Sequence, residues 1–270
     1  MKTSDIYHFS RRSQFTLFGA SVFTLAGFTW PFFAPSSNAA HFAQIFFWIA
    51  APLTLLLLIA QLSDKSLDAK SVALLGMLAA LIAALRPLGA GAVGLEPMWF
   101  LLILAARVFG SAFGFMLGVL GMLASALFTG GIGPWLSYQL FAAGLIGLFA
   151  GYVFKSLRGT AEILLLVFVS VFSSLIYGLL MDLQFWPWAI GTNTQLSFIP
   201  GGALVENLQR FITFHFLSAM AWDIPRAILT SILTVTAGPA VLTALRRTRV
   251  RAAFLTPIEF IERAKQPEVI

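Results

Sequence analysis

The amino-acid sequence predicts an all-α integral membrane protein with about eight transmembrane helices. Of its 270 residues, 59% are hydrophobic and only 10% are charged, whereas soluble domains carry roughly 25% charged residues. Long apolar runs, bounded by charges, glycine or proline, reach the ~20 residues that a helix needs to cross a bilayer. The net charge of +6 therefore indicates cytoplasmic loops rather than a nucleic-acid partner.

Eight apolar segments are predicted to form these helices. The stretch 97–128 is too long for one straight span, and we divide it near Arg107 and Gly110. A further segment, 203–221, has a helical pattern and is predicted to lie on or dip into the outer leaflet. The eight predicted helices cover residues 15–33, 42–62, 72–85, 98–109, 112–128, 135–154, 162–181 and 224–245.

The positions of lysine and arginine predict a multi-pass protein of the cell membrane with both termini in the cytoplasm. In this orientation, 14 of the 17 basic residues lie on the inner side, where Lys and Arg are retained during insertion. A spanning helix at 203–221 would move the C-terminal arginines outside, so we expect that segment to be external. The first apolar run exceeds the ~7–15 residues of a signal-peptide core, so we expect it to remain as a helix.

The helices group into three predicted regions. Residues 1–65 form an N-terminal two-helix accessory unit, residues 66–251 a six-helix membrane core, and residues 252–270 a cytoplasmic tail. The core contains an outer segment, 182–221, of about 40 residues, although connections usually have ~4–6. Because long connections are often binding loops, we expect this segment to close an outward-opening pocket.

Several kinds of chemistry have no support in the sequence. The chain has no cysteine, which excludes disulfides, thiol nucleophiles and thiolate metal sites. Its three histidines are far apart in the sequence, and it has neither a GxSxG elbow nor an HExxH helix, so esterase and zinc-protease motifs are absent. It also has no phosphate-binding loop, so it cannot hydrolyse ATP by the phosphate-loop mechanism. We expect no catalytic residue, no metal, no covalently bound cofactor and no enzymatic activity.

The sequence leaves three classes of membrane protein open besides one that binds a small molecule for transport by partner subunits. A stand-alone secondary transporter usually has two homologous halves, and no internal repeat is present. A membrane scaffold would bind no small molecule. A membrane enzyme would act through Glu96, Asp182 or Asp223.

The third predicted helix has a face of small residues. Gly76, Ala80 and Ala84 recur every four residues, and Ala79 and Ala83 repeat this spacing beside them. Small residues at this spacing let a second helix approach closely. The face is predicted to pack either against this chain or against a partner protein.

Aromatic and amide residues gather at the predicted outer side of the core. Rings and amides together can line a pocket for a flat, partly polar ligand. An interfacial aromatic belt is the alternative for the rings, and a helix cap with an intrahelical pair is the alternative for Asp223 and Arg226. The candidate substrate-binding residues are Trp135, Tyr138, Gln139, Trp186, Trp188, Asn193, Gln195, Asp223 and Arg226.

Three segments resemble the substrate-specific (S) component of energy-coupling factor (ECF) vitamin transporters. They are AARVFG at 105–110, GGIGPWLSYQLFAAGLIGLFAG at 130–151 and WDIPRA at 222–227. The resemblance extends over about residues 72 to 251 and implies a core of six helices. The first two predicted helices and the outer segment 182–221 depart from the compact pattern of the family.

The resemblance also implies a function. S components bind a vitamin or related micronutrient near the outer face and assemble with a membrane coupling protein and two cytosolic ATPases, so only the partner subunits use ATP. The alanine-rich helix would contact the coupling protein through Ala79, Ala80, Ala83 and Ala84. Among S components, the chain is most similar to those assigned to cobalamin or corrinoids.

Overall fold

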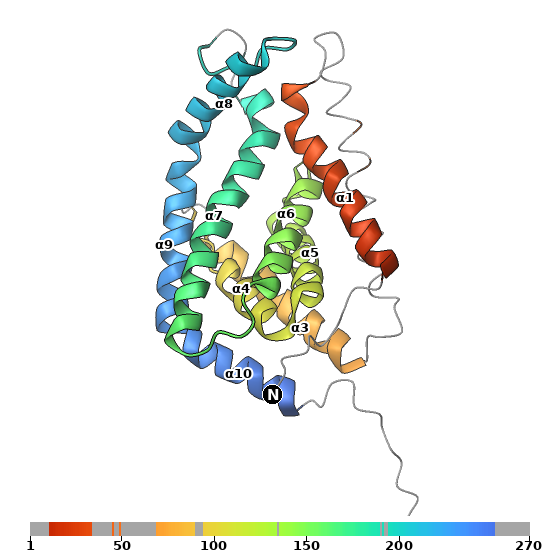
Figure 1. Ribbon diagram of the computed structural model, residues 1–270, viewed down its shortest axis with the longest axis vertical. Coiled ribbons are helices and arrows are strands. Elements are labelled where there is room, and N and C mark those ends of the chain that lie inside the picture. The colour runs from red at the N-terminus through yellow and green to blue at the C-terminus, as the bar shows by residue number, and fades with distance from the viewer. Residues whose placement is uncertain are drawn as a thin grey trace, which may run out of the picture.

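The structure, a computed structural model, describes residues 11–33, 69–89, 94–133, 135–189 and 194–251, with single positions at 45, 49 and 191. The predicted helix 42–62, apart from two positions, and the predicted tail 252–270 lie outside the described residues. The described part of the chain is helical throughout, without strands (Figure 1). Its α-helices are α1 (Arg11–Thr29), α3 (Ala69–Leu85), α4 (Met98–Phe109), α5 (Ser111–Thr129), α6 (Leu136–Tyr152), α7 (Thr160–Ala189), α8 (Leu204–Ser218), α9 (Met220–Thr236) and α10 (Gly238–Arg251).

Four of the described helices are long and apolar enough to cross a membrane, or five when the bent pair of α8 and α9 counts as one span. The helices α4 and α6 are apolar but shorter, with 12 and 17 residues. In Figure 1, α1, α7 and the α8–α9 pair run along the long axis of the molecule, and α10 crosses its lower end. We refer to the two ends as the α8 end and the α10 end.

The predicted break between the fourth and fifth helices is confirmed. Gly110 separates α4 from α5 with φ 107° and ψ 171°, a conformation that residues with a Cβ rarely adopt. Its N–H still donates to the carbonyl of Ala106 at 2.9 Å. The turn therefore folds α5 back beside α4 without leaving that donor unpaired.

The glycine-rich helices α5 and α6 pack tightly against each other. Gly114 and Gly147 face each other so closely that a Cβ on either would overlap the backbone of the other. A Cβ on Gly118 would likewise meet the backbone of Ala143. Small residues permit this close contact, on which helix association in lipid depends.

Replacement of Gly147 by alanine is expected to destabilise the isolated protein by about 1–3 kcal/mol, the usual cost of overpacking. Gly76→Ala is the matched control because a Cβ at Gly76 meets nothing within 4 Å, and alanine favours a helix by ~1 kcal/mol over glycine. Thermal unfolding in detergent, followed by tryptophan fluorescence, compares the two variants. Equal midpoints would show that the contact between Gly114 and Gly147 is not tight.

The helix predicted at 162–181 is longer than expected. The helix α7 runs to Ala189 and includes Asp182, Trp186 and Trp188, so the connection after it is shorter than the predicted outer segment. Asp182 lies inside the helix, and its Oδ2 lies 3.0 Å from His215 Nδ1 on α8. Pro187 lies inside α7, two residues before its end, so the carbonyl of Leu183 receives no N–H donor from residue 187.

The prediction of one last helix at 224–245 is wrong. A bend of 54° joins α8 to α9 in a single pair, α9 ends at Thr236, and α10 begins at Gly238. Pro239 starts the new helix at a position where no N–H donor is needed. The bent pair of α8 and α9 counts as at most one span. The chain therefore runs from α8 through α9 to the opposite end of the molecule, where α10 and its arginines lie (Figure 1).

A buried ionic cluster holds the α10 end together. Glu162 at the start of α7 accepts hydrogen bonds from Arg107 Nε of α4 at 2.8 Å and from Arg246 Nη2 of α10 at 2.6 and 2.7 Å. Arg107 also donates to the carbonyls of Val153 and Leu157. The carboxylate of Glu162 therefore connects three helices, and Arg107 extends the cluster to the loop between α6 and α7.

The N-terminal helix packs on the core at the other end. Phe28 of α1 lies 4.9 Å, ring centre to ring centre, from Tyr138 of α6. The short 3-10 turn η1 (Trp30–Phe32) then brings Phe32 to within 5.9 Å of Trp186. The start of the chain therefore covers apolar surface of α6 and α7 near the α8 end.

Candidate functional site

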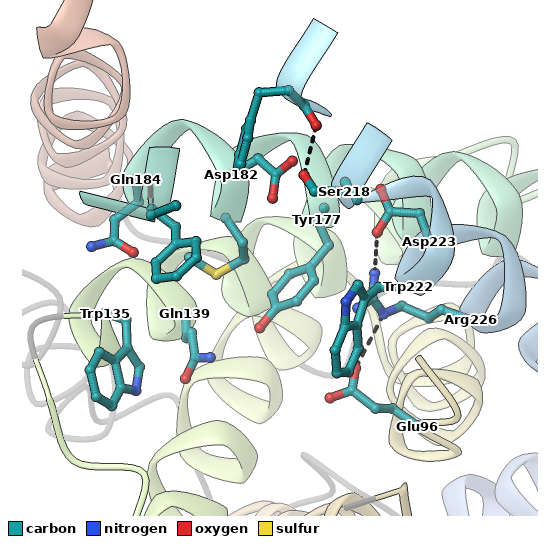
Figure 2. Close-up of a pocket in the computed structure, with 16 residues that line it drawn as sticks. Glu96, Trp135, Gln139, Tyr177, Asp182, Gln184, Ser218, Trp222, Asp223 and Arg226 are labelled. Carbon is teal, nitrogen blue, oxygen red and sulfur yellow. Dashed lines mark hydrogen bonds and ion pairs between the residues drawn. The ribbon is translucent and has the colours of Figure 1, made fainter. Parts of the chain in front are cut away.

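A cavity of about 600 Å³ lies between the start of α6, the second half of α7 and the junction of α8 with α9. Its size is within the ~300–1,000 Å³ of small-molecule sites. Figure 2 shows the side chains that surround it. The lining residues are Glu96, Trp135, Gln139, Tyr177, Gly178, Met181, Asp182, Gln184, Phe185, Ala189, Phe214, Ser218, Ala219, Trp222, Asp223 and Arg226.

Glycines place Glu96 at the edge of this cavity. Gly94 has φ +68°, and a Cβ on it would overlap the backbone of Trp222. A Cβ on Gly89 would overlap the carbonyl of Leu95. Glycine is therefore needed at both ends of the loop before α4, which presses Glu96 against the start of α9.

Arg226 links two carboxylates on one side of the cavity. Its Nε lies 3.1 Å from Glu96 Oε2, and its Nη1 lies 2.6 Å from Asp223 Oδ1. The guanidinium also stacks over the ring of Tyr177 at 5.1 Å. Trp99 supports Glu96 by donating its Nε1–H to Oε2 at 2.8 Å. The position of each charge is fixed by several neighbours.

Asp223 has one oxygen without a partner. Its side chain is only 1% exposed, Oδ1 receives the hydrogen bond from Arg226, and Oδ2 has no hydrogen-bond partner in the described part of the chain. The carboxylate lies directly against Gly178 of α7, where any Cβ would overlap it. Asp223 lines the cavity and holds a fixed acceptor without a partner among the described residues, and Oδ2 itself is shielded from solvent beside Gly178.

The opposite wall carries an oriented amide. Arg86 donates from Nη1 to Ser125 Oγ at 2.8 Å and from Nη2 to Gln139 Oε1 at 3.3 Å. Because the carbonyl oxygen of Gln139 accepts from Arg86, its Nε2 is left for the hydrogen bond with Tyr177. An amide nitrogen carries two N–H donors, so one of them remains for a ligand. Figure 2 shows Gln139 and Trp135 on one side, Asp223 and Arg226 on the other, and Tyr177 between them.

The structure brings together four of the predicted binding residues, Trp135, Gln139, Asp223 and Arg226. Tyr138 lies outside the lining and is buried against Phe28. Of the alternative for Asp223 and Arg226, the intrahelical pair is present as an i,i+3 ion pair. The helix cap is not, because Asp223 lies inside α9, whose N-cap is Ala219 without a side-chain hydrogen bond. Asp223 can form this pair and also line the cavity, because the ion pair with Arg226 uses only one of its two carboxylate oxygens.

The remaining predicted binding residues lie elsewhere or are not described. Trp186 is fully buried and donates Nε1–H to the carbonyl of Leu196 at 2.7 Å. Trp188 is 55% exposed and lies beside Trp30. Gln195 lines a separate cavity of about 510 Å³, and Asn193 lies outside the described residues.

The sequence-based selection of site residues missed most of the α7 wall. Tyr177, Met181, Phe185 and Ala189 line the cavity at spacings of four residues, which places them on one face of a helix. This spacing was visible in the sequence, but the predicted helix ended at residue 181 and therefore left out Phe185 and Ala189. Glu96 and Asp182 also line the cavity and were not among the predicted binding residues.

These features define a polytopic membrane protein with a cavity of small-molecule size between its helices. The family model described as ECF transporter, substrate-specific component, matches residues 70–238. That range is more than half of the chain and includes every residue that lines the cavity, and the chain belongs to this family. Comparisons with curated proteins and with solved structures give no match.

Membership of the family sets the role of the chain in coarse terms. It is a multi-pass membrane protein and the substrate-binding component of a transport system rather than an enzyme. The family implies partnership with an ECF module, which consists of a coupling protein and ATPases.

Proposed function

We propose that this S component captures a compact, vitamin-class micronutrient in the 600 Å³ cavity and delivers it to an ECF module for ATP-driven uptake. The observation that carries the proposal is the open cavity between α6, α7 and the α8–α9 junction, whose lining combines rings with fixed charges. Apolar walls with a few oriented polar groups are typical of small-molecule sites. The volume favours a compact ring compound over a whole corrinoid.

The distribution of charge supports an outward-facing cavity. Arg246, Arg247, Arg249 and Arg251 lie on α10, at the end opposite α8 (Figure 1). Basic residues are retained on the cytoplasmic side, so the α10 end would face the cytoplasm and the cavity would open toward the outside. The two termini would then both be cytoplasmic, with residues 1–65 as an accessory unit before the matched core.

The exposed face of α3 supports a contact with the coupling protein. Gly76, Ala80 and Ala84 are exposed along one side of the helix. Ala79 and Ala83 are buried against the rest of the chain, which limits the proposed contact to the other three. Both packing roles that the sequence left open for this helix are therefore supported, on different faces.

Mass spectrometry of the small molecules released from protein purified out of its native membrane tests the proposed function. We expect one compact micronutrient in a ratio near one to the protein. A preparation that carries no such compound, and that binds none from a panel of vitamins, would contradict the proposal and favour a scaffold protein.

Replacement of Gly178 by alanine is expected to weaken binding of the co-purified compound by about tenfold or more, equivalent to ~1.4 kcal/mol. The added Cβ would overlap the carboxylate of Asp223, which Arg226 prevents from rotating freely. Gly76→Ala is again the control. Calorimetry in detergent measures both affinities, and unchanged binding in Gly178→Ala would separate Asp223 from the binding site.

A further inference from the structure

We infer that the cavity selects a ring compound with a cationic N–H donor at one end and a hydrogen-bond acceptor at the other. The inference rests on the proposed function, namely that this cavity holds the transported compound. Three observations carry it: an unpaired carboxylate oxygen, an excess of acidic groups in the lining, and an oriented amide on the opposite wall.

The unpaired oxygen is Oδ2 of Asp223. Buried polar groups in proteins are almost always hydrogen-bonded, and each exception needs an explanation. Arg226 donates to Oδ1 and to Glu96 and leaves Oδ2 without a hydrogen bond in the described part of the chain. A ligand N–H would complete the set of hydrogen bonds, and a cationic donor would form the stronger, charge-assisted bond.

The lining has more acids than bases. Glu96, Asp182 and Asp223 contribute carboxylates, and Arg226 is the only cation among the described lining residues. His215 pairs with Asp182 from α8 without lining the cavity, and Arg86 is directed at Ser125 and Gln139 on the far wall. The wall made by α7 and α9 is therefore the acidic one, although the chain as a whole has a net charge of +6.

The α6 wall has the opposite preference. The Nε2 donor of Gln139 and the neighbouring guanidinium of Arg86 favour an acceptor such as a carbonyl oxygen. Between the two walls, the rings of Trp135, Tyr177, Phe185 and Trp222 line the cavity and offer stacking surfaces for an aromatic ligand. A dipolar ring compound fits both walls at once, whereas an anionic compound would meet the carboxylates.

Three probes of the same shape test this chemistry on the full-length protein. They are 4-(aminomethyl)benzamide, a cation; 4-(hydroxymethyl)benzamide, which is neutral; and 4-carbamoylbenzoate, an anion. Each offers the same amide to Gln139 and differs only in the group offered to Asp223. Ligand-observed NMR in detergent, with competition by the co-purified compound, gives the three affinities.

We expect the cation to bind about tenfold or more tightly than the anion, with the neutral probe between them. Asp223→Asn, which keeps an oxygen for Arg226, is expected to remove most of this preference. Glu206→Gln, in an exposed pair outside the cavity, is the control and should preserve it. The comparison of probes on the unaltered protein stands by itself if the Asn variant does not fold.

Equal responses to the cation and the anion, including no response to either, would overturn the inference. The same holds if the cation preference persists in a folded Asp223→Asn protein. Failure of the proposed function gives a different result, namely no ECF-dependent uptake. If a cation preference that depends on Asp223 is still measured in that case, the inference stands. Conversely, ATP-driven uptake of an acidic compound would preserve the proposed function and refute the inference.

Discussion

Replacement of Glu162 by glutamine is expected to lower the free energy of unfolding by about 3–5 kcal/mol, the cost of removing one partner from a buried ion pair. The side chains of Glu162 and Arg107 are only 2% and 1% exposed, so the neutral amide would leave the guanidinium buried without a counter-charge. Arg246 of α10 would lose the same partner. Chemical unfolding in detergent, with helical content followed by circular dichroism, measures the change.

Glu206→Gln provides the matched control for this substitution. Glu206 pairs with Arg210 at 2.9 Å on an exposed surface of α8, and such pairs contribute only about 0–1 kcal/mol. Both variants replace one carboxylate by one amide, so the difference between them isolates burial. Equal stability of the two variants would show that the cluster around Glu162 is not needed to hold α10 in place.

The double replacement of Ala80 and Ala84 by leucine is expected to abolish assembly with the coupling protein. Both alanines are exposed on α3, and larger side chains there prevent the close approach that small residues allow. Neither residue lines the cavity, so ligand affinity should be unchanged. Co-purification with an affinity-tagged ECF module measures assembly, and calorimetry measures binding.

The matched control places leucine at Ala203 and Ala221, which are equally exposed but lie at the α8 end. This protein should assemble with the module to the normal level. Normal assembly of the Ala80 and Ala84 variant would place the partner face on a different helix. Loss of assembly in both variants would indicate a general effect of added apolar surface.

Local signals predicted those parts of the fold that neighbouring residues determine. Gly110 alone accounts for the turn between α4 and α5, because its φ of 107° suits glycine. The close approach of α5 and α6 follows from glycines that recur within each helix. The start of α10 was missed, although Gly238 followed by Pro239 is a local signal for a new helix N-terminus.

Contacts between distant residues were not predictable from these signals. The seventh helix was predicted to end just before Asp182. The partner of this carboxylate, His215, lies 33 residues further along the chain, so local sequence gave no sign of it. Once α7 is extended, Trp186 and Trp188 fall on different faces of one helix, which explains why one is buried and the other exposed. The pair of Asp223 and Arg226 was predicted, but the third member of their network, Glu96, lies 130 residues from Arg226.

ATP-dependent uptake in proteoliposomes tests the central claim most directly. The vesicles contain this chain with the coupling protein and ATPases of an ECF module, and the substrate is the radiolabelled compound released from the purified protein. We predict accumulation that requires both ATP and the module and that disappears with the leucine variant of Ala80 and Ala84. Accumulation by this chain alone, without ATP, would contradict the S-component account and support a secondary transporter.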